Sequence, residues 1–158
     1  SYAMTGWRIG YAAANAEIAK AMSNYLSHST GSPCSISQQA ALAAFGESQE
    51  PSYEMKKAFD ERRKYFYERV QNIPGVSCLM PEGAFYIFMN IKELLGKTIK
   101  GIKINNSNDF ASAFLEKGLV AVVPGSAFGA DGYVRWSYAT SMENIKEGLD
   151  RLEKFLAD

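Results

Sequence analysis

The sequence contains few of the residues that build metal centres and disulfide frameworks. It has one histidine and two cysteines, Cys34 and Cys78, which do not form a Cys-x-x-Cys pair. A disulfide scaffold or a zinc site needs several such residues at short, regular spacing. We therefore expect no metal site, and a reducing, cytoplasmic setting is the simpler interpretation.

The sequence also lacks an excess of charge of either sign and any long apolar run. The 17 basic and 17 acidic residues cancel, whereas a surface for nucleic acid or an anionic membrane shows a basic excess on one element. No apolar run approaches the roughly 18 residues of a membrane span. We expect neither nucleic acid nor membrane as a partner.

What is present is the composition of an ordinary globular chain. The 158 residues are 47% hydrophobic and 22% charged, which is enough to build a sizeable core. Apolar periodicity and breaker residues predict helices over 15–27, 35–45, 52–73, 107–118 and from 141 onward. Strands are predicted over 7–14, 76–80, 84–91, 119–123 and 133–138. The fold class is therefore α+β or mixed α/β.

Local signals support these boundaries. Asn15, Ser107 and Ser141 are expected to cap helices, and the strand over 84–91 is apolar on both faces, as a strand covered on both sides should be. The segment 92–106 has no clear period and is expected to be a polar, mobile connection.

A charged run lies at 60–64 in the long third helix, and it could be a basic binding patch. The i,i+4 spacing of Lys64 and Glu68 and the flanking acids favour a solvated, ion-paired face instead.

Two arginines are candidate ligand-binding residues. Arg8 lies where a loop is expected to become a strand, and Arg135 lies in the middle of the strand over 133–138, where a charge is costly without a partner. The fork of donors on an arginine suits phosphate or carboxylate. The alternative is that both are ordinary surface arginines. The lone His28 lies in a polar turn and is more typical of a loop residue than of a catalyst.

Several motifs that occur in a fixed order favour ligand binding by the two arginines over the surface alternative. The chain opens with SYAMTGWRIGY over 1–11, and four further blocks follow, namely TGSP at 30–33, PEGAFY at 81–86, VPGSAFG at 123–129 and VRWSYATS at 134–141. Together they resemble the pyridoxal-phosphate aminotransferases of the fold-type-I aspartate aminotransferase family. In that family the opening block follows the cofactor lysine, which would immediately precede Ser1.

The resemblance implies roles for three residues. Arg8 resembles the arginine that neutralises the cofactor phosphate, and Arg135 the one that clamps the substrate α-carboxylate. Phe85 resembles an aromatic that lines the pocket, although core packing accounts for it equally well. No catalytic residue is expected within the chain, because the Schiff-base lysine precedes it. Trp136 stands where Leu or Ile is more usual, a change of packing rather than of charge.

The resemblance also implies an organisation. Residues 1–50 would be a remnant of the large cofactor-binding domain with one strand and two helices, 51–74 a long interdomain helix, and 75–158 the small C-terminal domain. The chain would be an inactive C-terminal fragment of a dimeric aminotransferase, and its orphan strand would favour self-association. Aspartate is a possible substrate. The alternatives are a noncatalytic assembly module and a pyridoxal-phosphate lyase of the same fold.

Overall fold

A computed structural model describes residues 1–157 of the chain, and they form two compact units. The first comprises Ser1–Met55 and the second begins at Lys56. Within residues 1–157, no helix combines the length and the apolar character that crossing a lipid bilayer requires.

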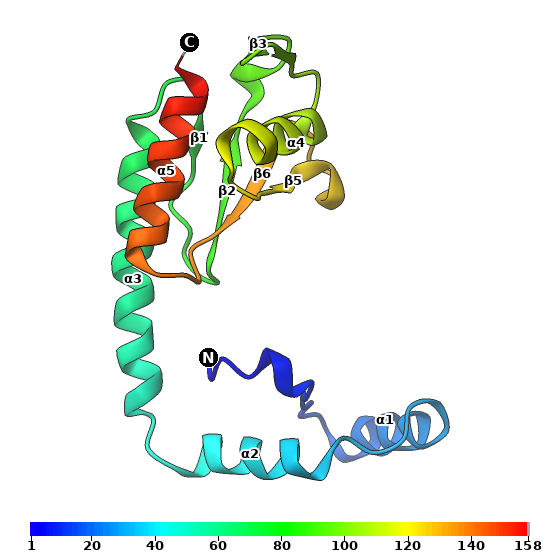
Figure 1. The fold of residues 1–158 in the computed structure, drawn as a ribbon. Helices are drawn as coiled ribbons and strands as arrows, with labels where there is room; N and C mark the ends of the chain where they lie inside the picture. The colour runs from blue at the N-terminus through cyan, green and yellow to red at the C-terminus, as the bar shows by residue number, and fades with distance from the viewer. Residues whose placement is uncertain (158) are drawn as a thin grey trace. The chain divides into compact units, whose positions relative to one another are not determined.

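The first unit contains a 3-10 turn and two helices. They are η1 (Thr5–Trp7), α1 (Ala16–Ser29) and α2 (Ser35–Gly46) (Figure 1). The Asn15 side chain accepts a hydrogen bond from the N–H of Ile18 and so caps α1 as predicted. The Ser37 hydroxyl on α2 donates to the carbonyl oxygen of Trp7 at 2.9 Å, which ties the N-terminal segment to α2.

The predicted strand over 7–14 is wrong. The chain makes η1 and then runs without regular structure as far as Asn15. Backbone N–H and C=O groups in a strand need a neighbouring strand to pair with, and no strand among the described residues pairs with this segment. The segment lies largely exposed, and Tyr11, which is 79% exposed, approaches Phe45 of α2 edge-on with ring centroids 5.2 Å apart.

The second unit is a small antiparallel sheet covered by helices. Its elements are α3 (Glu50–Gln71, of which the part from Lys56 belongs here), β1 (Ser77–Cys78), β2 (Tyr86–Asn90), η2 (Lys92–Leu94), β3 (Thr98–Ile99), β4 (Ile102–Lys103), α4 (Ser107–Gly118), β5 (Val123–Pro124), η3 (Gly125–Phe128), β6 (Tyr133–Ser137) and α5 (Met142–Leu156). The main sheet has the order β1-β2-β6-β5, and β3 and β4 form a separate hairpin. The mixed α and β class is as predicted.

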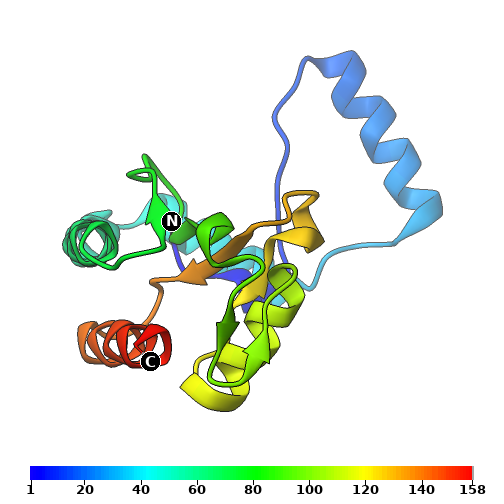
Figure 2. The ribbon, with the colours of Figure 1, turned by 90° about the horizontal axis from the view of Figure 1, so that it is seen from above.

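The helices α3, α4 and α5 cover one face of the main sheet. Figures 1 and 2 show α5 beside α3, and Arg69 of α3 joins the two through ion pairs to Asp150 and Glu153 at 2.8 and 2.9 Å. Trp136 of β6 lies at the centre of this core, against Phe66 and Phe114. A Cβ on Gly148 of α5 would meet the Trp136 ring at 3.4 Å, so the bulky tryptophan packs against a helix position with no side chain.

Three sequence expectations change at the level of single elements. The strand β2 is covered on one face only, since Ile87 and Met89 are buried while Phe88 is 38% exposed. The segment 92–106 is not an irregular connection: it forms η2 and the β3–β4 hairpin and buries Ile99 and Ile104. The cap of α4 is Asn106, whose side chain accepts from the N–H of Asp109.

Two further expectations change as well. The strand β5 is limited to Val123–Pro124. The ion partner of Lys64 is Asp60 rather than Glu68.

Candidate functional site

Arg135 lies on the face of the main sheet that the helices leave uncovered. In β6 it alternates with the buried residues Val134 and Trp136, so its side chain points to the opposite face. Its guanidinium carbon lies 4.3 Å from the ring centroid of Tyr86 and 4.6 Å from that of Phe128. The arginine is therefore flanked by two aromatic rings.

Within residues 1–157, Arg135 forms no ion pair with a carboxylate. Aromatic faces attract a cation but accept none of its N–H groups in the manner of a carboxylate oxygen. The donors in the guanidinium plane are thus left for a planar, doubly accepting ligand such as a carboxylate.

Tyr86 and Phe128 are the residues of this site that the sequence interpretation missed. Both lie in motifs that the sequence singled out, at the ends of the blocks over 81–86 and 123–129. The missing information was the strand register, in which Tyr86 faces Ser137 and Phe88 faces Arg135 across β2 and β6. The amino-acid sequence alone does not reveal which residues of β2 and β6 lie opposite each other.

Phe85 lies beside this site rather than in contact with Arg135. Its ring packs against Tyr86 at 4.4 Å and against Phe59 of α3 at 6.2 Å, measured between centroids. The half-buried ring therefore supports the core and also backs the tyrosine that stacks on Arg135.

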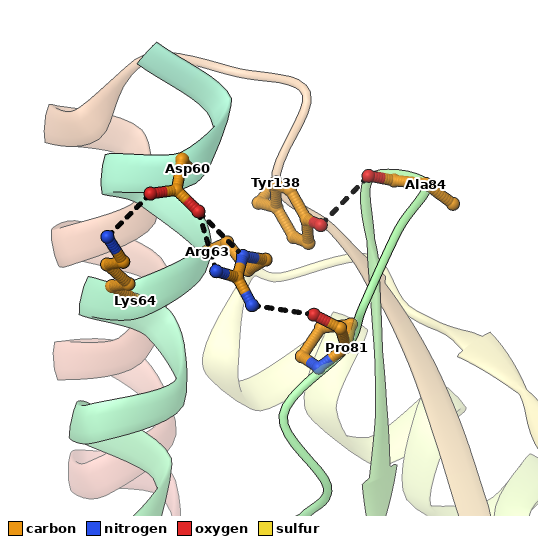
Figure 3. Close-up of polar contacts among 6 residues, drawn as sticks. All are labelled: Asp60, Arg63, Lys64, Pro81, Ala84 and Tyr138. Carbon is orange, nitrogen blue, oxygen red and sulfur yellow. Dashed lines mark hydrogen bonds and ion pairs between the residues drawn. The ribbon is translucent and has the colours of Figure 1, made fainter. Parts of the chain in front are cut away.

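The turn before Phe85 is held from two sides, as Figure 3 shows. The Tyr138 hydroxyl donates to the carbonyl oxygen of Ala84 at 2.9 Å, and the Tyr138 N–H donates to that of Phe85, also at 2.9 Å. From α3, Arg63 donates to the carbonyl oxygen of Pro81 at 2.8 Å. Burial raises the pKa of the Tyr138 phenol, which keeps it a neutral donor.

Arg8 lies in the first unit and Arg135 in the second. Arg8 is exposed, adopts the left-handed region with φ of 51°, and donates to the carbonyl oxygen of Thr5 at 3.2 Å. Because that partner is a neutral carbonyl, the charge of the guanidinium is not neutralised there, and Arg8 fits one contact to a phosphate.

Arg8 bears on the phosphate of pyridoxal phosphate, and the lysines bear on its aldehyde. A Schiff base needs an amine held inside the site. All 11 lysines are exposed, and Lys20 on α1 is the one lysine of the first unit. Arg8 is thus open to an anionic group, whereas the chain offers no enclosed amine that could react with an aldehyde.

The remaining candidates do not assemble into a site. His28 lies exposed near the end of α1 rather than in a turn. In the described part of the chain, no three His, Cys, Asp or Glu side chains come together in a way that could hold a metal ion.

Comparison with known proteins gives a consistent result. A family model described as "Aminotransferase class I and II" matches residues 1–152. The chain is 46% identical over 156 residues to the aspartate aminotransferase of Bacillus subtilis, covering 99% of this chain and 39% of that protein. It is 44% identical over 159 residues to the aspartate/prephenate aminotransferase of Nitrosomonas europaea, covering 99% and 40%.

A solved structure agrees with these sequence matches. The crystal structure of the aspartate aminotransferase from Rhizobium meliloti superposes with a TM-score of 0.90 at 44% identity, over 98% of this chain and 39% of that one. The chain thus spans about two fifths of the length of these relatives.

Proposed function

Since this chain belongs to the class I and II aminotransferase family, we propose that the whole protein transfers an amino group between an amino acid and a 2-oxo acid. The observation that carries the proposal is Arg135, a guanidinium that has no acidic partner in residues 1–157 and contacts two rings on an uncovered sheet face.

In this proposal Arg135 binds the α-carboxylate that amino acids and 2-oxo acids share. Two parallel N–H···O bonds fix the carboxylate in the guanidinium plane and orient the neighbouring carbon. Tyr86 and Phe128 both contact the guanidinium, and the ligand would bind the N–H groups that the rings leave open. Phe85 packs behind Tyr86, and in this proposal it lines the substrate pocket of the whole protein, as the family resemblance implies.

Pyridoxal phosphate, when bound, serves as the electron sink for amino-group transfer. Of the residues in this chain, Arg8 would hold its phosphate by a charge-assisted pair. The amine that attaches the cofactor would come from a part of the whole protein outside these 158 residues, because every lysine here is exposed.

Aspartate is the substrate that we favour. The relatives from B. subtilis and Rhizobium meliloti are named aspartate aminotransferases, and the one from N. europaea is named for aspartate and prephenate. A dicarboxylic substrate needs a second cation, and the loop over 28–32 contains no arginine or lysine. We therefore propose that the second cation lies elsewhere in the whole protein.

We further propose the organisation that the family resemblance implies. Residues 1–50 would belong to the cofactor-binding domain, 51–74 to an interdomain helix and 75–158 to the small domain of a cytoplasmic homodimer. Support for an interface comes from the large apolar side chains that α1 and α2 leave exposed, which include Ile18, Tyr25 and Leu42.

The test is Arg135→Lys in the whole protein. Lysine keeps the charge but cannot form two parallel bonds, and one charge-assisted bond is worth about 1.5–3 kcal/mol. We expect kcat/KM for aspartate with 2-oxoglutarate to fall by about tenfold to hundredfold. Arg151→Lys is the matched control, since Arg151 pairs with Glu147 on α5. Wild-type efficiency in Arg135→Lys would refute the assignment.

A further inference from the structure

We propose that Phe128 is a positioning residue that, together with Tyr86, clamps the Arg135 guanidinium and turns its donor edge toward the substrate carboxylate. This inference rests on the proposed function and deepens it. It assigns to the block over 123–129 a role in substrate binding that acts through Arg135.

Both rings of the clamp lie close to the guanidinium of Arg135. The centroids of the Tyr86 and Phe128 rings lie 4.3 and 4.6 Å from the guanidinium carbon, both within the range of a cation–π contact. A guanidinium in contact with two rings has fewer accessible orientations than one that extends freely into water. Its N–H groups stay available, because neither ring competes with a carboxylate as an acceptor.

The two rings come from rigid supports. Tyr86 is the first residue of β2, which pairs along its whole length with β6. Phe128 ends η3, where Gly129 and Ala130 donate backbone hydrogen bonds to Ser126 and Gly125. A Cβ on Gly125 would lie 2.2 and 2.6 Å from the carbonyl oxygens of Ala130 and Tyr133, so the start of η3 is packed directly on the chain leading into β6.

Phe128 is not needed for the core. Its side chain is 48% exposed, and its other aromatic contact is an edge-on approach to Phe88 at 6.2 Å. A large ring that remains half in water while stacking on a cation contributes little to folding. It does restrict a flexible arginine before the ligand arrives, which lowers the entropy lost on binding.

The kinetic test uses the whole protein with three variants. Phe128→Leu should raise KM for the amino acid roughly threefold to tenfold, the size of one lost cation–π contact, while kcat changes little. Phe128→Tyr keeps the aromatic face and should restore the wild-type KM. Tyr133→Leu removes a ring from the same sheet face whose cation contact is Lys92, and it should leave KM unchanged.

A double-mutant cycle separates positioning from a general effect on structure. In an Arg135→Gln background, Phe128→Leu should have no further effect on KM, because the neutral amide has no cation to stack. A Phe128→Leu effect of equal size in both backgrounds, or its failure to be rescued by tyrosine, would overturn the inference.

A second readout does not depend on activity. In the whole protein labelled with [15N]arginine, the Nε–Hε signal of Arg135, assigned from its loss in Arg135→Lys, should carry ring-current shifts. Phe128→Leu should move this signal and Tyr133→Leu should not. An unmoved signal in Phe128→Leu overturns the clamp. If the wild-type whole protein has no transaminase activity, the proposed function fails. The Nε–Hε signal of Arg135 then still shows whether Phe128 packs on the guanidinium.

Discussion

The guanidinium of Arg63 on α3 donates a hydrogen bond of 2.8 Å to the carbonyl oxygen of Pro81, 18 residues further along the chain (Figure 3). The same guanidinium is held on its other side by Asp60, whose Oδ1 lies 2.6 Å from Nη2. Tyr138, which follows β6, holds the opposite end of the turn at Ala84. The helix α3 and the main sheet therefore both hold the turn that precedes Phe85 and Tyr86.

We predict that Tyr138→Phe destabilises the second unit without unfolding it. Tyr138 is 1% exposed, and the loss of its hydroxyl leaves the carbonyl oxygen of Ala84 without that donor. The free energy of unfolding in urea should fall by about 0.5–1.5 kcal/mol. Tyr67→Phe on α3 is the control, because the Tyr67 hydroxyl makes no hydrogen bond within residues 1–157. Equal stabilities of the two variants would contradict the prediction.

We predict that Asp60 makes stability depend on pH in the acid range. Hydrogen bonds from Lys64 and Arg63 hold the pKa of the Asp60 carboxyl below its usual value. Its contribution is therefore fully present above the unfolded-state pKa of about 4 and is lost as pH falls through the lower folded-state pKa. Asp60→Asn should reduce stability at neutral pH, and the deficit should shrink on acidification.

Denaturant melts of wild type and Asp60→Asn at a series of pH values measure this deficit. Glu61→Gln serves as the control, because Glu61 is exposed and forms no ion pair in the described part of the chain. A deficit for Asp60→Asn that is the same at every pH would show that the loss comes from packing rather than from the carboxylate charge.

The sequence predicted the elements whose signals are local. The capping residues Asn15 and Ser141 each accept a hydrogen bond from the N–H three residues ahead, as proposed, because capping depends only on the adjacent turn. The positions of α1, α2, α3 and α5 follow from these signals and from apolar spacing. The predicted cap of α4, Ser107, is one residue too late. Asn106 and Ser107 are both residue types that cap helices well, and Asn106 is the one that accepts the capping hydrogen bond.

The sequence could not predict features that depend on a partner. The segment 7–14 has the composition of a strand, but a ladder also needs a neighbour, and none is present among the described residues. The apolar Phe88 contributed to the prediction that its strand is covered on both faces. The apolar character of a strand does not show on which face the helices pack. The clamp on Arg135 depends on the register between β2 and β6 and on η3, which are tertiary facts.

We predict that the two cysteines react with thiol reagents at different rates. The N–H groups of Ser37 and Ile36 at the start of α2 lower the pKa of exposed Cys34, whereas burial raises the pKa of Cys78 to about 11. The thiolate is the reactive form. At pH 7.5 iodoacetamide should modify Cys34 first, as mass spectrometry of timed digests would show. Denatured protein should lose the preference, and faster labelling of Cys78 in the folded chain would contradict these environments.

We predict that the 158-residue chain alone forms no specific Schiff base with pyridoxal phosphate. A cofactor lysine must be an amine held against the aldehyde, and every lysine here is exposed, including Lys20 on α1. Arg8 can attract the phosphate, but one charge pair in water, screened by salt, is worth at most about 1 kcal/mol. After incubation with the cofactor and reduction with borohydride, peptide mapping should show sparse labelling spread over several lysines. Arg8→Ala should leave that pattern unchanged. Stoichiometric labelling at a single lysine would show instead that this chain holds a complete cofactor-attachment site.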